Sequence, residues 1–142
     1  GDNPQQAAEE KTWFDQQRGL IFYNKKKKNR QLKMPDEVYD YLSIHLLHRQ
    51  MADAGLAEKD IVFYKNGKLV DSHIRLDRQL ELVRDGSKFR VDRLTQSFDG
   101  SRKKMIYYYQ QDSLAPLKIE QQDPDKTNKV MWRIALNRQP AS

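Results

Sequence analysis

Apolar side chains recur at helical spacing in one part of the chain, and farther along they alternate with polar ones. On a helical wheel, in which successive residues are about 100° apart, one broad arc contains Val38, Tyr41, Leu42, His45, Leu46 and Ala52. Leu47 and Met51 lie outside that arc, which leaves open the alternative that the helix is covered on more than one side. Pro35 suits the first helical position, and Gly55 suits the residue that ends a helix. The spacing therefore predicts a main helix over 35–56 that packs against the rest of the protein through the residues of this arc.

The N-terminal residues have the composition of an earlier helix. Asn3 suits the capping position, and Pro4 suits the first helical position because its missing N–H is not needed there. Gly19 is a suitable end for this helix. We therefore expect a helix from Pro4 to about Arg18, followed over Leu20–Tyr23 by either a short strand or an apolar anchor for the helix.

Alternation of polar and apolar residues from Asp60 onward is typical of strands. Asn66-Gly67 and Asp85-Gly86 favour the type I′ turns of two-residue hairpins, and Asp99-Gly100 predicts a third turn. The second turn implies a register that pairs Leu80 with Val91, Glu81 with Arg90 and Leu82 with Phe89. The alternation of Val130, Trp132, Ile134 and Leu136 predicts a final strand.

Two helices followed by hairpin-linked strands predict an α+β fold. We expect a single domain over 1–142, in which 1–34 forms a helix and a basic connection, 35–56 the main helix and 60–137 an antiparallel sheet. Both N-terminal helices would pack on one face of that sheet. This order resembles the layout of cystatin-like and NTF2-like folds, without a shared motif. Folds of that layout include enzymes, ligand binders and assembly modules, so the layout selects no function.

The composition is that of a polar domain with a thin core. Of 142 residues, 37% are hydrophobic and 32% are charged, against about 45–50% and about 25% in typical domains. The absence of cysteine excludes a disulfide framework, a thiolate metal site and a cysteine nucleophile. The first residue is Gly1, so we expect that a segment has been removed upstream, where a secretory or lipoprotein signal would lie. The alternatives are that Gly1 is a tag remnant or that the domain was cut from a longer cytoplasmic chain.

The net charge of +6 is concentrated in one short segment, because basic and acidic residues nearly balance in the rest of the chain. The segment 25–34 holds no acidic residue and contains Lys25, Lys26, Lys27, Lys28, Arg30 and Lys33. Runs of like charge are usually solvated loops. On this interpretation, the segment is a loop before Pro35 with a structural role alone. The functional alternative is attraction to phosphate, on a nucleic acid or on an anionic membrane surface.

A second basic run, Arg102, Lys103 and Lys104, lies beside the aromatic run Tyr107-Tyr108-Tyr109. Aromatic side chains near cations stack on bases or contact a peptide partner. Alternation places Tyr107 and Tyr109 on one face of a strand and Tyr108 on the other. The structural alternative is that these tyrosines only pair across strands, where tyrosine is favoured.

Signatures of catalysis and of metal binding are absent from the sequence. His45 and His48 have a spacing that suits metal ligands, but no third ligand is indicated, and His45 lies on the apolar arc. The stretch 123–128 departs from the calcium-loop pattern, and no serine lies in a nucleophile elbow. We therefore predict no catalytic residue, no metal and no cofactor.

These observations favour a non-enzymatic protein-interaction or assembly module with a protein partner, exported or lipoprotein-like and placed in the periplasm or cell envelope rather than the cytoplasm. The alternative is a nucleic-acid-binding module that uses the basic segment 25–33 and the strand Tyr107–Tyr109. An enzyme or ligand binder with a sheet-lined cavity is the third hypothesis. In each of the first two, we expect the binding contacts to come from the two basic runs and from Tyr107 and Tyr109.

Overall fold

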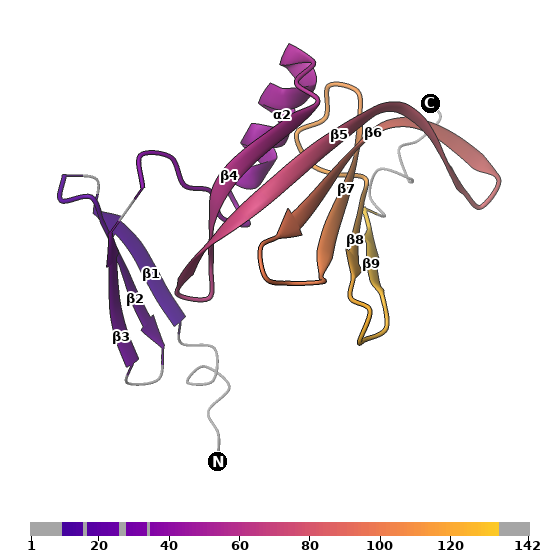
Figure 1. Cartoon of the computed structure of the whole chain (residues 1–142). Coiled ribbons are helices and arrows are strands. Elements are labelled where there is room, and N and C mark those ends of the chain that lie inside the picture. Colours follow the sequence, from indigo (N-terminus) through magenta and orange to yellow (C-terminus); the bar gives the residue numbers. More distant parts are fainter. Residues whose placement is uncertain (1–9, 16, 26–27, 34, 134–142) are drawn as a thin grey trace.

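The protein is mostly β-structure. A computed structural model describes residues 10–15, 17–25, 28–33 and 35–133, of which 59% are in strands and 9% in the single helix of these residues. The strands form one three-stranded and one six-stranded antiparallel sheet (Figure 1). The predicted α+β fold with two N-terminal helices packed on a sheet, in a cystatin-like or NTF2-like layout, is therefore wrong.

The three-stranded sheet occupies the region in which we expected the first helix. Its strands, in spatial order, are β1 (Glu10–Asp15), β2 (Leu20–Lys25) and β3 (Lys28–Lys33). Thr12 and Phe14 contact Tyr64 of the other sheet, whereas Trp13 between them is half exposed. This period of two is that of a strand, and the tertiary contact overrides the helical composition of the segment. Residues 1–9 lie outside the described part.

Leu20–Tyr23 forms a strand, one of the two structures that we considered for it. Ile21 and Tyr23 are buried on the side that faces the six-stranded sheet. The expected anchor is therefore supplied by alternate residues of β2 rather than by a continuous apolar patch.

The six-stranded sheet is a meander in which each strand pairs with the next along the chain. Its strands are β4 (Glu58–Lys65), β5 (Lys68–Arg84), β6 (Ser87–Phe98), β7 (Lys104–Gln110), β8 (Lys118–Gln122) and β9 (Lys129–Trp132). The predicted antiparallel sheet is confirmed. The last strand reaches Trp132, and the predicted continuation through Leu136 falls outside the described residues.

Both two-residue hairpin turns are confirmed. Asn66 and Gly67 have φ values of 49° and 78°, and Asp85 and Gly86 have values of 51° and 79°. Positive φ at both central residues is what a type I′ turn requires. The register predicted around the second turn is also confirmed, with the facing pairs Leu80–Val91, Glu81–Arg90 and Leu82–Phe89.

The helix α2 (Ile44–Ala54) ends at Gly55 as predicted but begins nine positions after Pro35. The segment before it runs along the edge of β4, where the Tyr39 N–H donates to the Val62 carbonyl and the Tyr64 N–H donates to the Tyr39 carbonyl. These bonds hold Tyr39 outside a helix. The predicted packing face is also wrong, because the buried residues of α2 are Ile44, Leu47, His48 and Met51.

Two separate cores follow from this arrangement. The larger core lies between α2 and one face of the six-stranded sheet and includes Phe63, Ile74 and Leu94. The smaller core joins the two sheets around Ile21, Tyr23 and Tyr64. No helix in the described ranges is long and apolar enough to cross a membrane.

Candidate functional site

The turn between β4 and β5 is the place where the two basic runs of the sequence meet. On one side, Arg30 of β3 donates from Nη1 to the carbonyl oxygen of Gly67 at 3.4 Å. The ring of Tyr23, which faces Arg30 across the β2–β3 ladder, lies directly against Gly67. The first basic run is therefore fixed to this turn by a side-chain contact and by packing.

The second basic run reaches the turn from its other side. Lys65 and Lys68 face each other at the ends of the two strands that the turn connects. Burial and the neighbouring ammonium of Lys103 lower the pKa of Lys65. Neither Lys65 nor Lys103 forms an ion pair with another described residue. Like charges in close approach repel, so an anion bound between them would remove a repulsion that the free protein retains.

We call this surface the basic end, and it consists of Arg30, Lys65, Lys68, Arg102, Lys103 and Lys104. Among the described residues, its one carboxylate partner is Asp125, which lies 3.7 Å from Arg102. Both side chains of that pair are mostly exposed, so the pair is weak. Sequence reasoning missed Lys65 and Lys68, although they flank the Asn66-Gly67 turn that it located.

The other described basic residues of segment 25–33 lie in the strands β2 and β3 rather than in a connection that follows a helix. Lys25 and Lys28 face each other at the end of the ladder. Lys33 is exposed at the far end of β3. Lys26 and Lys27 lie outside the described residues. The charge surplus is thus carried largely by a strand pair, which holds its members at fixed spacing.

Tyr107 and Tyr109 share a face of β7, as the alternation predicts, but that face is covered by α2. Their side chains are only 2% and 7% exposed and belong to the larger core. They are therefore inaccessible to bases or to a partner in this structure. Tyr108 on the opposite face is partly exposed, with the Lys118 ammonium 5.1 Å from its ring centroid.

His45 and His48 meet at the hydroxyl of Tyr109. Nδ1 of His48 lies 2.6 Å from the Tyr109 oxygen, and Nδ1 of His45 lies 2.9 Å from it. A hydroxyl has one hydrogen, so it donates to one imidazole and accepts from the other. We assign the shorter bond to the hydroxyl donor, because O–H donors form shorter bonds than N–H donors. His48 then carries its hydrogen on Nε2, which has no hydrogen-bond partner among the described residues.

This cluster has the properties of a core element and not of a metal site. Burial and the neighbouring His45 lower the pKa of His48 to about 3, so its imidazole is neutral at ordinary pH. Within the described part of the chain, no group of three or more potential metal ligands comes together. The packing of the two histidines against Tyr107 and Tyr109 agrees with the interpretation of His45 as a core or boundary imidazole.

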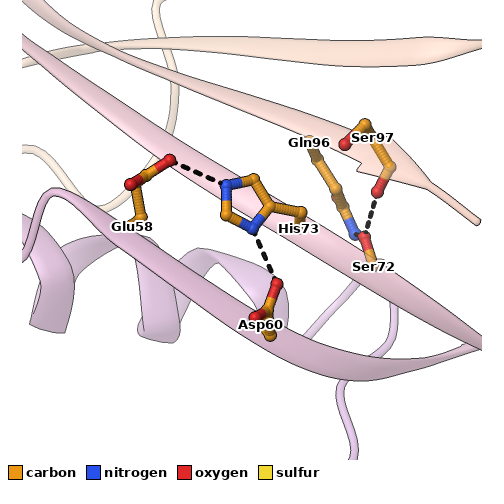
Figure 2. A network of polar contacts seen from close by, with 6 residues as sticks. All are labelled: Glu58, Asp60, Ser72, His73, Gln96 and Ser97. Atoms are coloured by element: carbon orange, nitrogen blue, oxygen red, sulfur yellow. Dashed lines mark hydrogen bonds and ion pairs between the residues drawn. The ribbon is translucent and has the colours of Figure 1, made fainter.

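A trough of about 780 Å³ crosses β4, β5 and β6, and its lining includes the acidic residues Glu37, Asp60, Asp71 and Asp99. Inside it, His73 lies between two carboxylates (Figure 2), with Nδ1 2.7 Å from Asp60 and Nε2 3.0 Å from Glu58. Hydrogen bonds to both carboxylates raise the pKa of His73.

This arrangement does not activate a nucleophile. Asp60, His73 and Ser97 face one another across three strands, but both imidazole nitrogens are already bonded to carboxylates. No nitrogen is left to accept a proton from the Ser97 hydroxyl, which general-base activation requires. Ser72, which is buried, instead donates to the Ser97 carbonyl at 2.6 Å and accepts from Gln96 at 3.0 Å (Figure 2).

No family model, curated protein or solved structure matches the chain. The basic end holds six cations, and among the described residues Arg102 alone of them has a carboxylate partner, whereas in the trough Glu37 is paired with Lys59, and His73 with Asp60 and Glu58.

Proposed function

We propose that the protein is a non-enzymatic binding module that engages an anionic partner through the basic end. The observation that carries this proposal is the meeting of two basic runs, distant in sequence, on either side of the Asn66-Gly67 turn. Strand pairing fixes the backbone positions from which Lys65 and Lys68 project, and the contact to Gly67 fixes the Arg30 side chain, before a partner arrives. Such preorganisation lowers the entropy that binding has to overcome.

The chemistry of the other two sites supports a role without catalysis. His73 is bonded through both nitrogens, and His48 is buried and neutral. Neither is arranged to transfer a proton to or from a substrate. An anionic partner is compatible with both sequence-based hypotheses, an interaction module and a nucleic-acid-binding module.

The test compares two double variants that remove the same amount of charge. Lys65→Gln with Lys103→Gln alters the basic end, and Lys88→Gln with Arg90→Gln alters the exposed tip of the β5–β6 hairpin. Binding to heparin is measured over a series of salt concentrations. We expect the first variant to bind more weakly and to show a shallower slope of log K against log salt, because it neutralises fewer anionic groups and therefore releases fewer counterions.

The hairpin-tip variant serves as the control, because it has the same net charge as the basic-end variant. It should retain the affinity and the salt slope of the unmodified protein. Equal losses of affinity in the two variants would show that only net charge matters, and the proposed site would then be wrong.

A further inference from the structure

The three-stranded sheet has an outer face that points away from the rest of the protein. Thr12, Tyr23 and Leu32 mark the inner face, because each contacts or packs toward Tyr64. Residues one position away point to the opposite side of a strand. The outer face therefore carries Lys11, Trp13, Phe22, Asn24, Gln31 and Lys33.

An aromatic pair occupies the centre of this face. Trp13 and Phe22 face each other across the β1–β2 ladder, and their rings are stacked, with centroids 5.4 Å apart and planes 14° from parallel. Trp13 remains 50% exposed. The Arg18 guanidinium lies 5.4 Å from the centroid of Phe22 and is oriented by an ion pair of 2.6 Å with Asp15. Two large rings thus form a fixed stacking platform at the surface.

The surroundings of the platform indicate what stacks on it. Gln31 lies beside Phe22 in the next strand of the same row, and its amide offers both a donor and an acceptor. Lys11 and Lys33 supply exposed positive charge on the same face. Asp15, the acidic residue of this face among the described residues, is already paired with Arg18. Aromatic rings, amides and cations together are the chemistry that recognises a nucleotide, with stacking for the base and charge for the phosphate.

We propose that this outer face binds unpaired bases of single-stranded nucleic acid, with the phosphate backbone directed toward the basic end. The inference rests on the proposed function, because β3 is an edge strand of its sheet, and a single strand that leaves the platform past Gln31 and passes around this edge reaches Arg30, whose side chain lies on the opposite face. A single strand is required, since the bases of a duplex are stacked on one another and leave no free face for Trp13. Sequence reasoning missed the platform because it placed Trp13 in a helix and Phe22 in a strand or an anchor.

The experiment uses tryptophan fluorescence of the full chain. The sequence has two tryptophans, so Trp132→Phe leaves Trp13 as the sole reporter. Titration with oligo-dT of about 12 nucleotides, a length within the range of common single-strand sites, should quench this fluorescence as a base stacks on the ring. Trp13→Ala should weaken the affinity for oligo-dT by about 5- to 150-fold, the change that corresponds to ~1–3 kcal/mol per stacked base.

Two control variants separate stacking from folding. Trp13→Phe keeps an aromatic ring and should retain most of the affinity, while Leu46→Ala removes an exposed apolar side chain from α2 and should leave binding unchanged. Circular dichroism and the thermal midpoint establish that each variant is folded. Heparin binding should be the same in Trp13→Ala and in the unmodified protein, because heparin offers no base to stack.

The failures of the two proposals are distinguishable. Absence of binding to both heparin and oligo-dT would overturn the proposed function itself. Heparin binding without quenching of Trp13, or tighter binding of a duplex than of oligo-dT, would overturn the platform while leaving the basic end intact. Quenching by a neutral oligosaccharide, with none by oligo-dT, would show that the platform binds sugar rings, and this too would contradict the inference.

Discussion

The ring of Tyr23 packs against Gly67 where the two sheets meet, and a matched pair of substitutions isolates this contact. A Cβ atom added at Gly67 would lie 2.7 Å from Cδ1 and 2.8 Å from Cε1 of Tyr23, closer than real Cβ contacts come. A Cβ added at Gly86 would meet nothing within 4 Å. Both glycines hold the second place of a type I′ turn, with φ values of 78° and 79°. Gly67→Ala and Gly86→Ala therefore differ in packing and not in backbone conformation.

The expected magnitudes follow from this difference. A non-glycine residue in the left-handed region costs about 1–2 kcal/mol, partly offset by the lower unfolded-state entropy of alanine, a gain of about 0.4–1 kcal/mol. Gly86→Ala should thus lower the free energy of unfolding by about 1 kcal/mol. Gly67→Ala adds the overpacking of a buried ring, typically about 1–3 kcal/mol, for a total loss of about 2–4 kcal/mol.

Urea unfolding followed by circular dichroism gives both free energies by linear extrapolation. Repeating Gly67→Ala in a Tyr23→Leu background completes a double-mutant cycle, and the additional loss should shrink there because the clashing ring is gone. If both alanine variants lose the same free energy, Tyr23 does not rest on the turn in solution. The packing of Tyr23 on Gly67 that joins the two sheets would then be contradicted.

Other predictions concern the helix and the histidines. Leu47→Ala should lower the free energy of unfolding by about 2–5 kcal/mol and Leu42→Ala by less than about 0.5 kcal/mol in urea titrations, because the side chains are 3% and 85% exposed. The pKa of His48 is about 3 in the folded protein and 6.5 as an isolated group, so the unfolded state binds more protons below pH 6.5. Stability should therefore fall as the pH drops from 6.5 toward 3, and it should fall less steeply in His48→Gln, as urea unfolding at each pH will show. The carboxylates raise the pKa of His73, so its small stabilising contribution is present below pH 6.5 and is lost as the pH rises through the folded pKa. NMR titration of Asp60→Asn should show a lower pKa for His73, and an unchanged value would contradict the ion pair.

The hairpins were predictable because their determinants are local. At Asp85-Gly86, turn residues that tolerate positive φ and the alternation of the flanking residues specify the same register, and a shift of one residue would turn every side chain to the wrong face. The helix end at Gly55 is equally local, since glycine adopts the left-handed conformation that ends a helix. Such features need no knowledge of what packs against them.

The N-terminal segment shows where local reasoning fails. Its composition favours a helix, yet Thr12 and Phe14 both reach Tyr64 only if the segment is a strand. Helix propensities differ by tenths of a kcal/mol per residue, so a few tertiary interactions outweigh them. The predicted start of α2 is wrong for a similar reason, because the hydrogen bonds of Tyr39 to the edge of β4 depend on a strand that follows later in the chain.

By itself, the sequence determined which residues carry the excess charge, where the chain turns, and that Tyr107 and Tyr109 share one face of a strand. Only the tertiary structure decided that α2 covers those tyrosines and that Arg30 and Lys103 lie on either side of Gly67. The envelope location, the single domain and the absence of a cofactor stay predictions. The physical reason for the division is range: turn chemistry and alternation act between near neighbours, whereas burial and charge clustering depend on segments that only the folded chain brings together.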